Sequence, residues 1–145
     1  MPKFTYKLQS VLNLRKQVEN AAKNDLAVQL KKLSNAQKQL HMVLTEQEEG
    51  FNRLSDEYKE GIQVTRLRQY NYYFNNVAER VKQQKESVKK ASKDVDISRE
   101  KLIKASKEKK ILETLREKKY DEFLREQLKA EEKVTDEVVS YRYTK

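Results

Sequence analysis

The sequence contains no cysteine and no tryptophan, and it has only one histidine, one proline and two glycines. Without cysteine, disulfide bonds and thiolate chemistry are excluded. So few helix-breaking residues argue against a loop-rich or all-β protein. No apolar stretch approaches the roughly 20 residues that a membrane-spanning helix needs, and residues 1–8 lack the apolar core of a secretory signal. We therefore expect a cytoplasmic protein.

Residues that could carry catalysis are equally scarce. His41 has no second histidine at ligand spacing, so a metal site is not expected. Gly50 and Gly61 stand apart and lack the Lys-Ser/Thr ending of a phosphate-binding loop. Carboxylates such as Glu48 and Glu49 fall on helix surface that we expect to be exposed, where no pocket would shift a pKa. The sequence thus predicts a protein that is not an enzyme and that binds no cofactor.

Charged and helix-forming residues dominate the 145 positions. Charged residues make up 38% of the chain and hydrophobic residues 37%, and the net charge is +9. Residues 61–145 carry most of the excess, with 22 basic and 15 acidic side chains. Lys, Glu, Gln, Leu and Ala favour helices, and the apolar residues are regularly spaced rather than scattered as in a disordered chain. The composition predicts long helices with a basic surface.

The apolar residues of positions 4–60 follow a heptad repeat, which predicts one long helix with a coiled-coil seam. The a positions of this repeat are Leu30, Gln37, Leu44, Phe51 and Tyr58. The d positions are Leu26, Leu33, Leu40, Gln47 and Leu54. Gly61 suits the left-handed position that ends a helix, and Thr65 suits the N-cap of the next helix. We therefore expect a turn near residues 61–65.

A second heptad repeat follows the turn. Its a positions are Phe74, Val81, Val88, Val95 and Leu102, and its d positions are Val77, Gln84, Ala91, Ser98, Ala105 and Leu112. Small residues alternate with β-branched valines in these rows, which suits close approach of two helices. A short connection makes the two helices antiparallel neighbours.

The predicted fold is all-α, a long two-helix antiparallel coiled-coil hairpin with a longer second helix. We expect a single rod-like domain over residues 1–145, with helix one over about residues 4–60 and helix two over about residues 65–138. The C-terminus should overhang as a single helix or fray. Folding back from the turn places Phe4 near residue 121.

Four aromatic side chains follow the turn, at Tyr70, Tyr72, Tyr73 and Phe74. Successive helical positions lie about 100° apart, so a two-helix seam can bury only some of them. We expect Phe74 on the seam, Tyr70 close to it, and Tyr72 and Tyr73 exposed. Exposed aromatic rings are good anchors for a protein partner, but these rings could equally wrap over the turn and cap the hairpin. Val43, beside the seam, could join Tyr73 and Val77 in one exposed apolar strip.

The end that carries the two termini combines apolar and basic residues. The N-terminal segment includes Phe4, Tyr6 and Leu8, and the opposing residues 112–128 are rich in Arg and Lys. Such an amphipathic basic tip could enter an acidic ring or groove.

Three segments resemble the FliJ family of the bacterial flagellar export apparatus. Residues 4–15 (FTYKLQSVLNLR) resemble the FliJ opening of an aromatic-x-aromatic pair, Leu-Gln, a leucine pair and a basic residue. Residues 61–70 (GIQVTRLRQY), followed by Tyr73, Val77 and Val81, resemble the FliJ hairpin segment. Residues 115–123 (LREKKYDEF), 131–132 and 134–138 (VTDEV) resemble the C-terminal region of the family. The resemblance covers the whole chain.

The resemblance implies a coiled coil similar to the central stalk of rotary ATPases. Its termini end would insert into the flagellar export ATPase hexamer, and its flank would contact the export gate protein FlhA. It would help to couple ATP hydrolysis and proton motive force to export, escort substrate chaperones and lie peripherally at the cytoplasmic face of the membrane. The implied gate-binding residues are Gln39, Val43, Tyr73, Val77 and Gln84, while Glu46, Gly50 and Arg80 depart from the apolar pattern of that face. The implied ring-binding residues are Phe4, Leu8, Arg116, Lys119, Tyr120 and Phe123.

Three other functions remain open from the residues. The stalk protein of a virulence-type secretion system would share this architecture. A basic coiled coil that binds nucleic acid would show strongly salt-dependent affinity, although acidic residues interrupt the lysine stretches. A self-assembling coiled coil would form a stable oligomer, with Gln37 and Gln47 setting its register.

Overall fold

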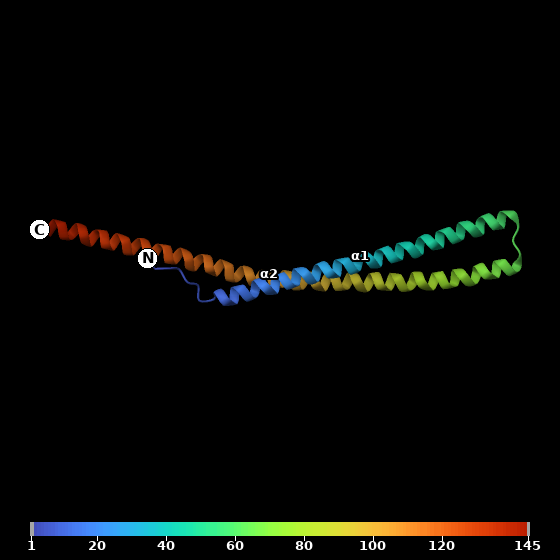
Figure 1. Cartoon of the computed structure of the whole chain (residues 1–145), viewed down its shortest axis with the longest axis horizontal. Helices are drawn as coiled ribbons and strands as arrows, with labels where there is room; N and C mark the ends of the chain where they lie inside the picture. Colours follow the sequence, from blue (N-terminus) through green and yellow to red (C-terminus); the bar gives the residue numbers. More distant parts are fainter. Residues whose placement is uncertain (1, 145) are drawn as a thin grey trace. The chain divides into compact units, whose positions relative to one another are not determined.

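Two helices account for nearly all of the computed structural model, which describes residues 2–144. Helix α1 spans Gln9–Glu60 and helix α2 spans Val64–Thr144. No strand occurs among the described residues. Figure 1 shows α1 coloured from blue to green and α2 from green to red. The predicted all-α helical hairpin is confirmed, and its second helix is the longer one.

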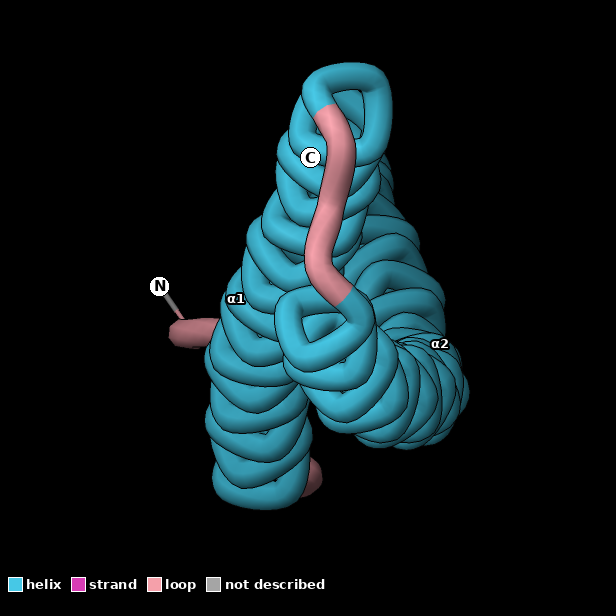
Figure 2. Tube along the Cα trace, turned by 90° about the vertical axis from the view of Figure 1, so that its right-hand side faces the viewer, coloured by secondary structure: helices cyan, strands magenta, loops and turns pink. Residues whose placement is uncertain are grey.

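The connection between the helices is residues 61–63, the pink segment that joins them in Figure 2. Gly61 has a φ of +96°, in the left-handed region, and its N–H donates to the Tyr58 carbonyl at 3.3 Å. This confirms the predicted glycine stop. The N–H of Leu67 donates to the Gln63 carbonyl at 3.0 Å, so Gln63 occupies the N-cap position. The expectation that Thr65 caps the second helix is wrong.

Both helix limits away from the turn differ from the expected ones. α1 begins at Gln9 rather than at residue 4, because the preceding residues pack against α2 instead of continuing the helix. The Phe4 ring lies 5.2 Å from that of Tyr120, and the Tyr6 hydroxyl donates to the Leu112 carbonyl at 3.3 Å. α2 continues to Thr144, beyond the expected end near residue 138.

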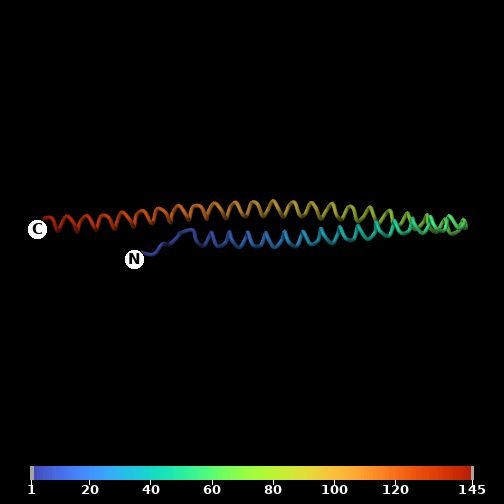
Figure 3. The backbone as a smooth tube through the Cα atoms, turned by 90° about the horizontal axis from the view of Figure 1, so that it is seen from above, coloured from blue at the N-terminus to red at the C-terminus, as the bar shows by residue number. Residues whose placement is uncertain are grey.

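The chain divides into two units, each pairing a segment of α1 with a segment of α2. The terminal unit comprises Met1–Ala21 and Leu102–Lys145, although Met1 and Lys145 lie outside the described residues. The turn unit comprises Ala22–Lys101. Within the terminal unit, the red end of α2 extends past the start of α1 (Figures 1 and 3), and residues 128–144 are exposed.

The seam of the turn unit contains the predicted residues on α2. Val77, Val81, Val95 and Ser98 are buried there. The remaining predicted positions of this segment, at Phe74, Gln84, Val88 and Ala91, are half-buried. Val43 from α1 completes a core cluster with Val77 and Val81.

On α1, one of the two predicted rows is wrong. The d row is half-buried as expected, but the a row is exposed, from 38% at Leu44 to 70% at Tyr58. The second row of the seam lies one position earlier and consists of Ala22, Gln29, Ala36, Val43, Gly50 and Glu57. Ala22, Ala36 and Gly50 are small, and small side chains at a contact let two helix axes approach closely.

Candidate functional site

The terminal unit contains an aromatic cluster that joins the N-terminal segment to α2. The Phe4 ring meets Tyr120 edge-on at 5.2 Å and Phe123 at 5.5 Å. The Arg116 guanidinium lies 5.5 Å from the centre of the Phe4 ring, which is cation–π geometry. The prediction that Phe4 lies near residue 121 is therefore confirmed.

A hollow of about 620 Å³ lies beside this cluster. Phe4, Leu8, Lys119 and Phe123 are among the residues that line it. Lys119 is also 3.5 Å from the carboxylate of Glu122. The structure therefore brings together all six side chains of the expected ring-binding set, since Arg116 and Tyr120 contact Phe4 directly.

Charged residues continue the seam through the terminal unit, which sequence reasoning missed. Lys109 Nζ lies 2.9 Å from Glu19 Oε1, and Glu19 is only 5% exposed. The hydrogen bond from Lys109 to Glu19 is the main cause that raises the pKa of Lys109. Arg15 donates to Glu108 at 2.7 Å. The spacing of the residues could have revealed these seam positions. Steps of three and four residues along α1 connect Leu12, Arg15, Glu19 and Ala22 to the seam.

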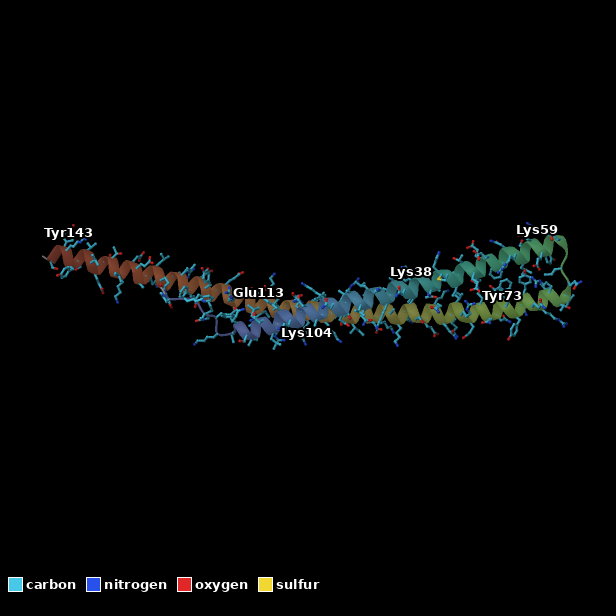
Figure 4. All side chains as sticks on the ribbon, in the orientation of Figure 1. Lys38, Lys59, Tyr73, Lys104, Glu113 and Tyr143 are labelled. Atoms are coloured by element: carbon cyan, nitrogen blue, oxygen red, sulfur yellow. The ribbon has the colours of Figure 1, made fainter. Side chains whose placement is uncertain are left out.

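The turn unit carries a polar flank around Glu46 on α1. Arg80 donates to both Glu46 carboxylate oxygens, at 3.2 and 2.9 Å, and the Tyr73 hydroxyl donates to Glu46 Oε1 at 3.0 Å. The bonds from Arg80 and then Tyr73 lower the pKa of Glu46. Burial, followed by the bond to Glu46, raises the pKa of Tyr73. Tyr73 lies on α2 close to the turn (Figure 4) and is half-buried, so the expectation that it is exposed is wrong.

The five expected gate-binding residues differ in accessibility. Gln39 is exposed, and Tyr73 and Gln84 are half-buried. Val43 and Val77 are only 7% and 1% exposed and lie in the core between the helices. The expected exposed strip through Val43 and Val77 is therefore absent, because Val43 belongs to the seam row rather than to its edge. Gln39, Glu46 and Arg80 line a shallow hollow on this flank.

Gly50 lets the aromatic side chains near the turn pack closely. A Cβ atom at Gly50 would lie 3.1 Å from ring carbons of both Tyr73 and Phe74. The Phe74 ring stacks on Phe51 at 4.3 Å and on Tyr70 at 5.9 Å. Tyr72, by contrast, is 78% exposed, as expected. Three of the four aromatic residues that follow the turn thus pack on the hairpin.

A second carboxylate fixes the turn end. Glu57 accepts bonds from Arg66 at 3.2 and 3.1 Å and from the Tyr70 hydroxyl at 2.8 Å. Arg66 first, and Tyr70 second, lower the pKa of Glu57. These bonds join the last turns of α1 to the first turns of α2.

Neither metal-binding nor membrane-spanning features are found in residues 2–144. No group of three or more His, Cys, Asp or Glu side chains is placed to hold a metal ion in this part of the chain. Neither described helix segment contains an apolar stretch long enough to cross a bilayer.

Comparison with known proteins relates the chain to one family. The model of the flagellar FliJ protein family matches residues 4–145. The fold is similar to that of CT670 from Chlamydia trachomatis, described as a candidate YscO homologue. That likeness has a TM-score of 0.68 and 24% sequence identity over 98% of this chain and 96% of CT670. No curated protein shows significant sequence similarity. The family match extends over nearly the whole sequence, and the chain therefore belongs to the FliJ family of flagellar proteins.

Proposed function

We propose that this chain is a non-enzymatic, central-stalk-like component of the flagellar type III protein export apparatus. Membership of the FliJ family supports the assignment to flagellar export. In this proposal the terminal unit binds the hexameric export ATPase, and the turn unit binds the export gate protein FlhA. The chain helps to couple ATP hydrolysis and proton motive force to export, and it helps to escort substrate chaperones. It lies peripherally at the cytoplasmic face of the cell membrane at the flagellar basal body, held there by its partners.

The observation that carries the ring-binding proposal is the cluster of Phe4, Arg116, Tyr120 and Phe123. These contacts hold the N-terminal segment against α2 and so present Leu8 and Lys119 beside them. A surface that combines aromatic rings with arginine and lysine suits recognition of a partly acidic protein surface.

We assign gate binding to the polar flank of the turn unit. Gln39, Tyr73 and Gln84 provide its accessible side chains, next to the Glu46–Arg80 ion pair. Val43 and Val77 contribute indirectly by supporting Tyr73, which packs against the buried cluster that they form with Val81. Exposed ion pairs are individually weak, so this flank suits a contact that is repeatedly made and broken.

The test is ring assembly and ATP hydrolysis by the cognate flagellar ATPase in the presence of the full chain. We expect wild type to promote both. The double variant Arg116→Glu with Lys119→Glu should lose this effect, as should a chain truncated after residue 112. Lys90→Glu with Lys93→Glu is the matched control, because it changes the same charge on exposed residues of the turn unit. Equal stimulation by all variants, or no binding by wild type, would refute the ring-binding proposal.

A second candidate is the stalk protein of a virulence-type secretion system, favoured by the fold likeness to CT670. The two candidates are separated by deleting the gene and scoring swimming motility and secretion of virulence substrates. Loss of motility alone supports the flagellar assignment. Salt-dependent binding to duplex DNA, with no effect on either process, would instead support a nucleic-acid function.

A further inference from the structure

The turn unit exposes a second apolar row on α1, which we call the side row. It consists of Leu30, Gln37, Leu44, Phe51 and Tyr58 at heptad spacing. Its four large apolar members are 40%, 38%, 49% and 70% exposed, in chain order. Four residues after each of the first four members come Ser34, His41, Glu48 and Ser55, and none of these except Glu48 is an Asp, Glu, Lys or Arg. This face is poor in charge although 38% of the chain is charged.

The side row lies on the opposite side of the seam from the polar flank. Glu46 meets Arg80 and Tyr73 on one side. Phe51 stacks on Phe74 at 4.3 Å with an interplanar angle of 19°, which places the side row at the other edge. Between these edges the seam rows of α1 face α2. Helix α1 therefore carries the seam rows that face α2 and, beside them, the apolar side row. An apolar face of this width is typical of a helix that packs against two neighbours.

Next to the side row, α2 presents a basic edge. Ala78 follows Phe74 by four residues and therefore lies on the same side of α2. Ala78, Lys82, Lys85 and Lys89 line a shallow groove of about 360 Å³, together with Val81 and Glu86. Within the described chain no ion pair reaches any of these three lysines. The two helices thus form one surface, with an apolar row on one side and free cationic groups on the other.

We propose that this surface binds an acidic amphipathic helix of another protein. The apolar residues of that helix would pack on Leu30, Leu44 and Phe51, while its carboxylates would face Lys82, Lys85 and Lys89. This is the helix-in-groove mode of recognition, with charge pairs setting the orientation. A second copy of this chain fits less well, since it carries a net charge of +9 and would bring two basic edges together.

The binding test uses the full chain and a fluorescent synthetic peptide of about four heptads, with leucine at a and d and glutamate at e and g. A matched peptide carries lysine in place of glutamate. We expect fluorescence anisotropy to show saturable binding of the acidic peptide, weakened by added salt, and no binding of the basic peptide. This result would be independent of the ATPase assay, because it concerns neither the aromatic cluster of the terminal unit nor the Glu46 flank.

Two variants locate the binding surface. Leu30→Gln with Leu44→Gln should weaken binding by about tenfold or more, because both apolar side chains that would pack on the peptide are lost without any change of charge. Met42→Gln is its control, because Met42 is an apolar residue that is 62% exposed and off the side row. Lys82→Glu with Lys85→Glu should also weaken binding, whereas Lys90→Glu with Lys93→Glu should not. Circular dichroism would verify that each variant keeps its helical content.

Several outcomes would overturn the proposal. Equal binding of acidic and basic peptides would show that charge plays no part. Unchanged affinity in the Leu30 and Leu44 variant would exclude the side row. Light scattering could also show that the molar mass of the chain rises with concentration. If the Leu30 and Leu44 variant abolished this rise, the occupant of the surface would be a second copy of the chain. Binding to vesicles of phosphatidylserine, with no binding of the acidic peptide, would identify a membrane surface instead.

Discussion

At the scale of single residues, Gly50 shows how packing overrides local preference. A glycine inside a helix costs about 1 kcal/mol relative to alanine. At this position, however, any side chain would place its Cβ 3.1 Å from ring carbons of Tyr73 and Phe74. The glycine therefore permits the rings of Tyr73 and Phe74 to pack over α1. The Tyr73 hydroxyl donates a hydrogen bond to Glu46 from this position.

The substitution Gly50→Val should destabilise the turn unit by about 1–3 kcal/mol, because it overfills a packed contact. Urea unfolding followed by circular dichroism would measure the change. Ala130→Val is the control, since Ala130 is exposed on α2. If Gly50→Val were no less stable than Ala130→Val, the close ring packing would not be what requires glycine.

At the scale of the elements, ion pairs and hydrogen bonds join α1 to α2 in each unit. In the turn unit, Ser98 donates to Asp25 at 2.5 Å, and Glu46 and Glu57 accept bonds from residues of α2. The bond from Ser98 is the main cause that lowers the pKa of Asp25. All three carboxylates thus have a lower pKa in the folded chain than in the unfolded one.

This direction determines how stability should depend on pH. A carboxylate with a lowered folded pKa stabilises the fold above its unfolded pKa, and the contribution is lost as the pH falls through the folded value. The thermal midpoint should therefore hold steady near neutral pH and fall as the pH drops below about 4. Melting curves from pH 7 to pH 3 at constant ionic strength would measure this. The variant Glu46→Gln with Glu57→Gln should show a flatter profile, and an identical profile would contradict the prediction.

The Glu19–Lys109 pair joins the helices in the terminal unit. Glu19 is 5% exposed, and its removal would leave Lys109 with the longer contact to Glu113 at 3.8 Å as its remaining ion pair. Glu19→Leu alone should lower the thermal midpoint. Glu19→Leu combined with Lys109→Met should recover much of the loss, because an apolar pair of similar volume often replaces a buried ion pair well. A double variant that melts below the single one would rule out this account.

At the scale of the whole molecule, the two helices have unequal lengths. α2 extends past the start of α1 in the terminal unit, and every residue from 128 to 144 is exposed. Figure 4 places Tyr143 on this part of α2, and its side chain is 87% exposed. Within residues 2–144, four ion pairs that join α1 to α2 (Arg15–Glu108, Glu19–Lys109, Glu46–Arg80 and Glu57–Arg66) all lie before this segment. The stability of the hairpin should therefore not depend on it.

Truncation after Leu128 should leave the thermal midpoint nearly unchanged and lower only the helical signal. Circular dichroism on the truncated and full chains would measure both quantities. Truncation after residue 112 provides the contrast, since it removes Arg116, Tyr120 and Phe123 and should lower the midpoint. A large loss of stability on truncation after Leu128 would mean that the removed residues 129–145 stabilise the hairpin.

Local sequence determined much of this fold. Helix-forming composition, the heptad rows of α2 and Gly61 predict two antiparallel helices with a turn, because helix periodicity and the left-handed glycine position are local properties. Antiparallel pairing then brings Phe4 to Tyr120 and Phe123 by counting residues from the turn. The expected ring-binding set as a whole came from the resemblance to the FliJ family rather than from this counting, and its binding role is a proposal.

Tertiary structure decided which face of α1 meets α2. The d row can be paired either with the row of Leu44 and Phe51 or with the row of Val43 and Gly50, since both pairings alternate steps of three and four residues. Hydrophobicity favoured the first pairing. The structure adopts the second, because small residues admit close approach and Glu46 and Glu57 find partners on α2. Likewise, residues 4–8 could extend the helix by pattern alone, but their contacts with α2 hold them outside it. Both choices depend on the partner helix, which no local pattern describes.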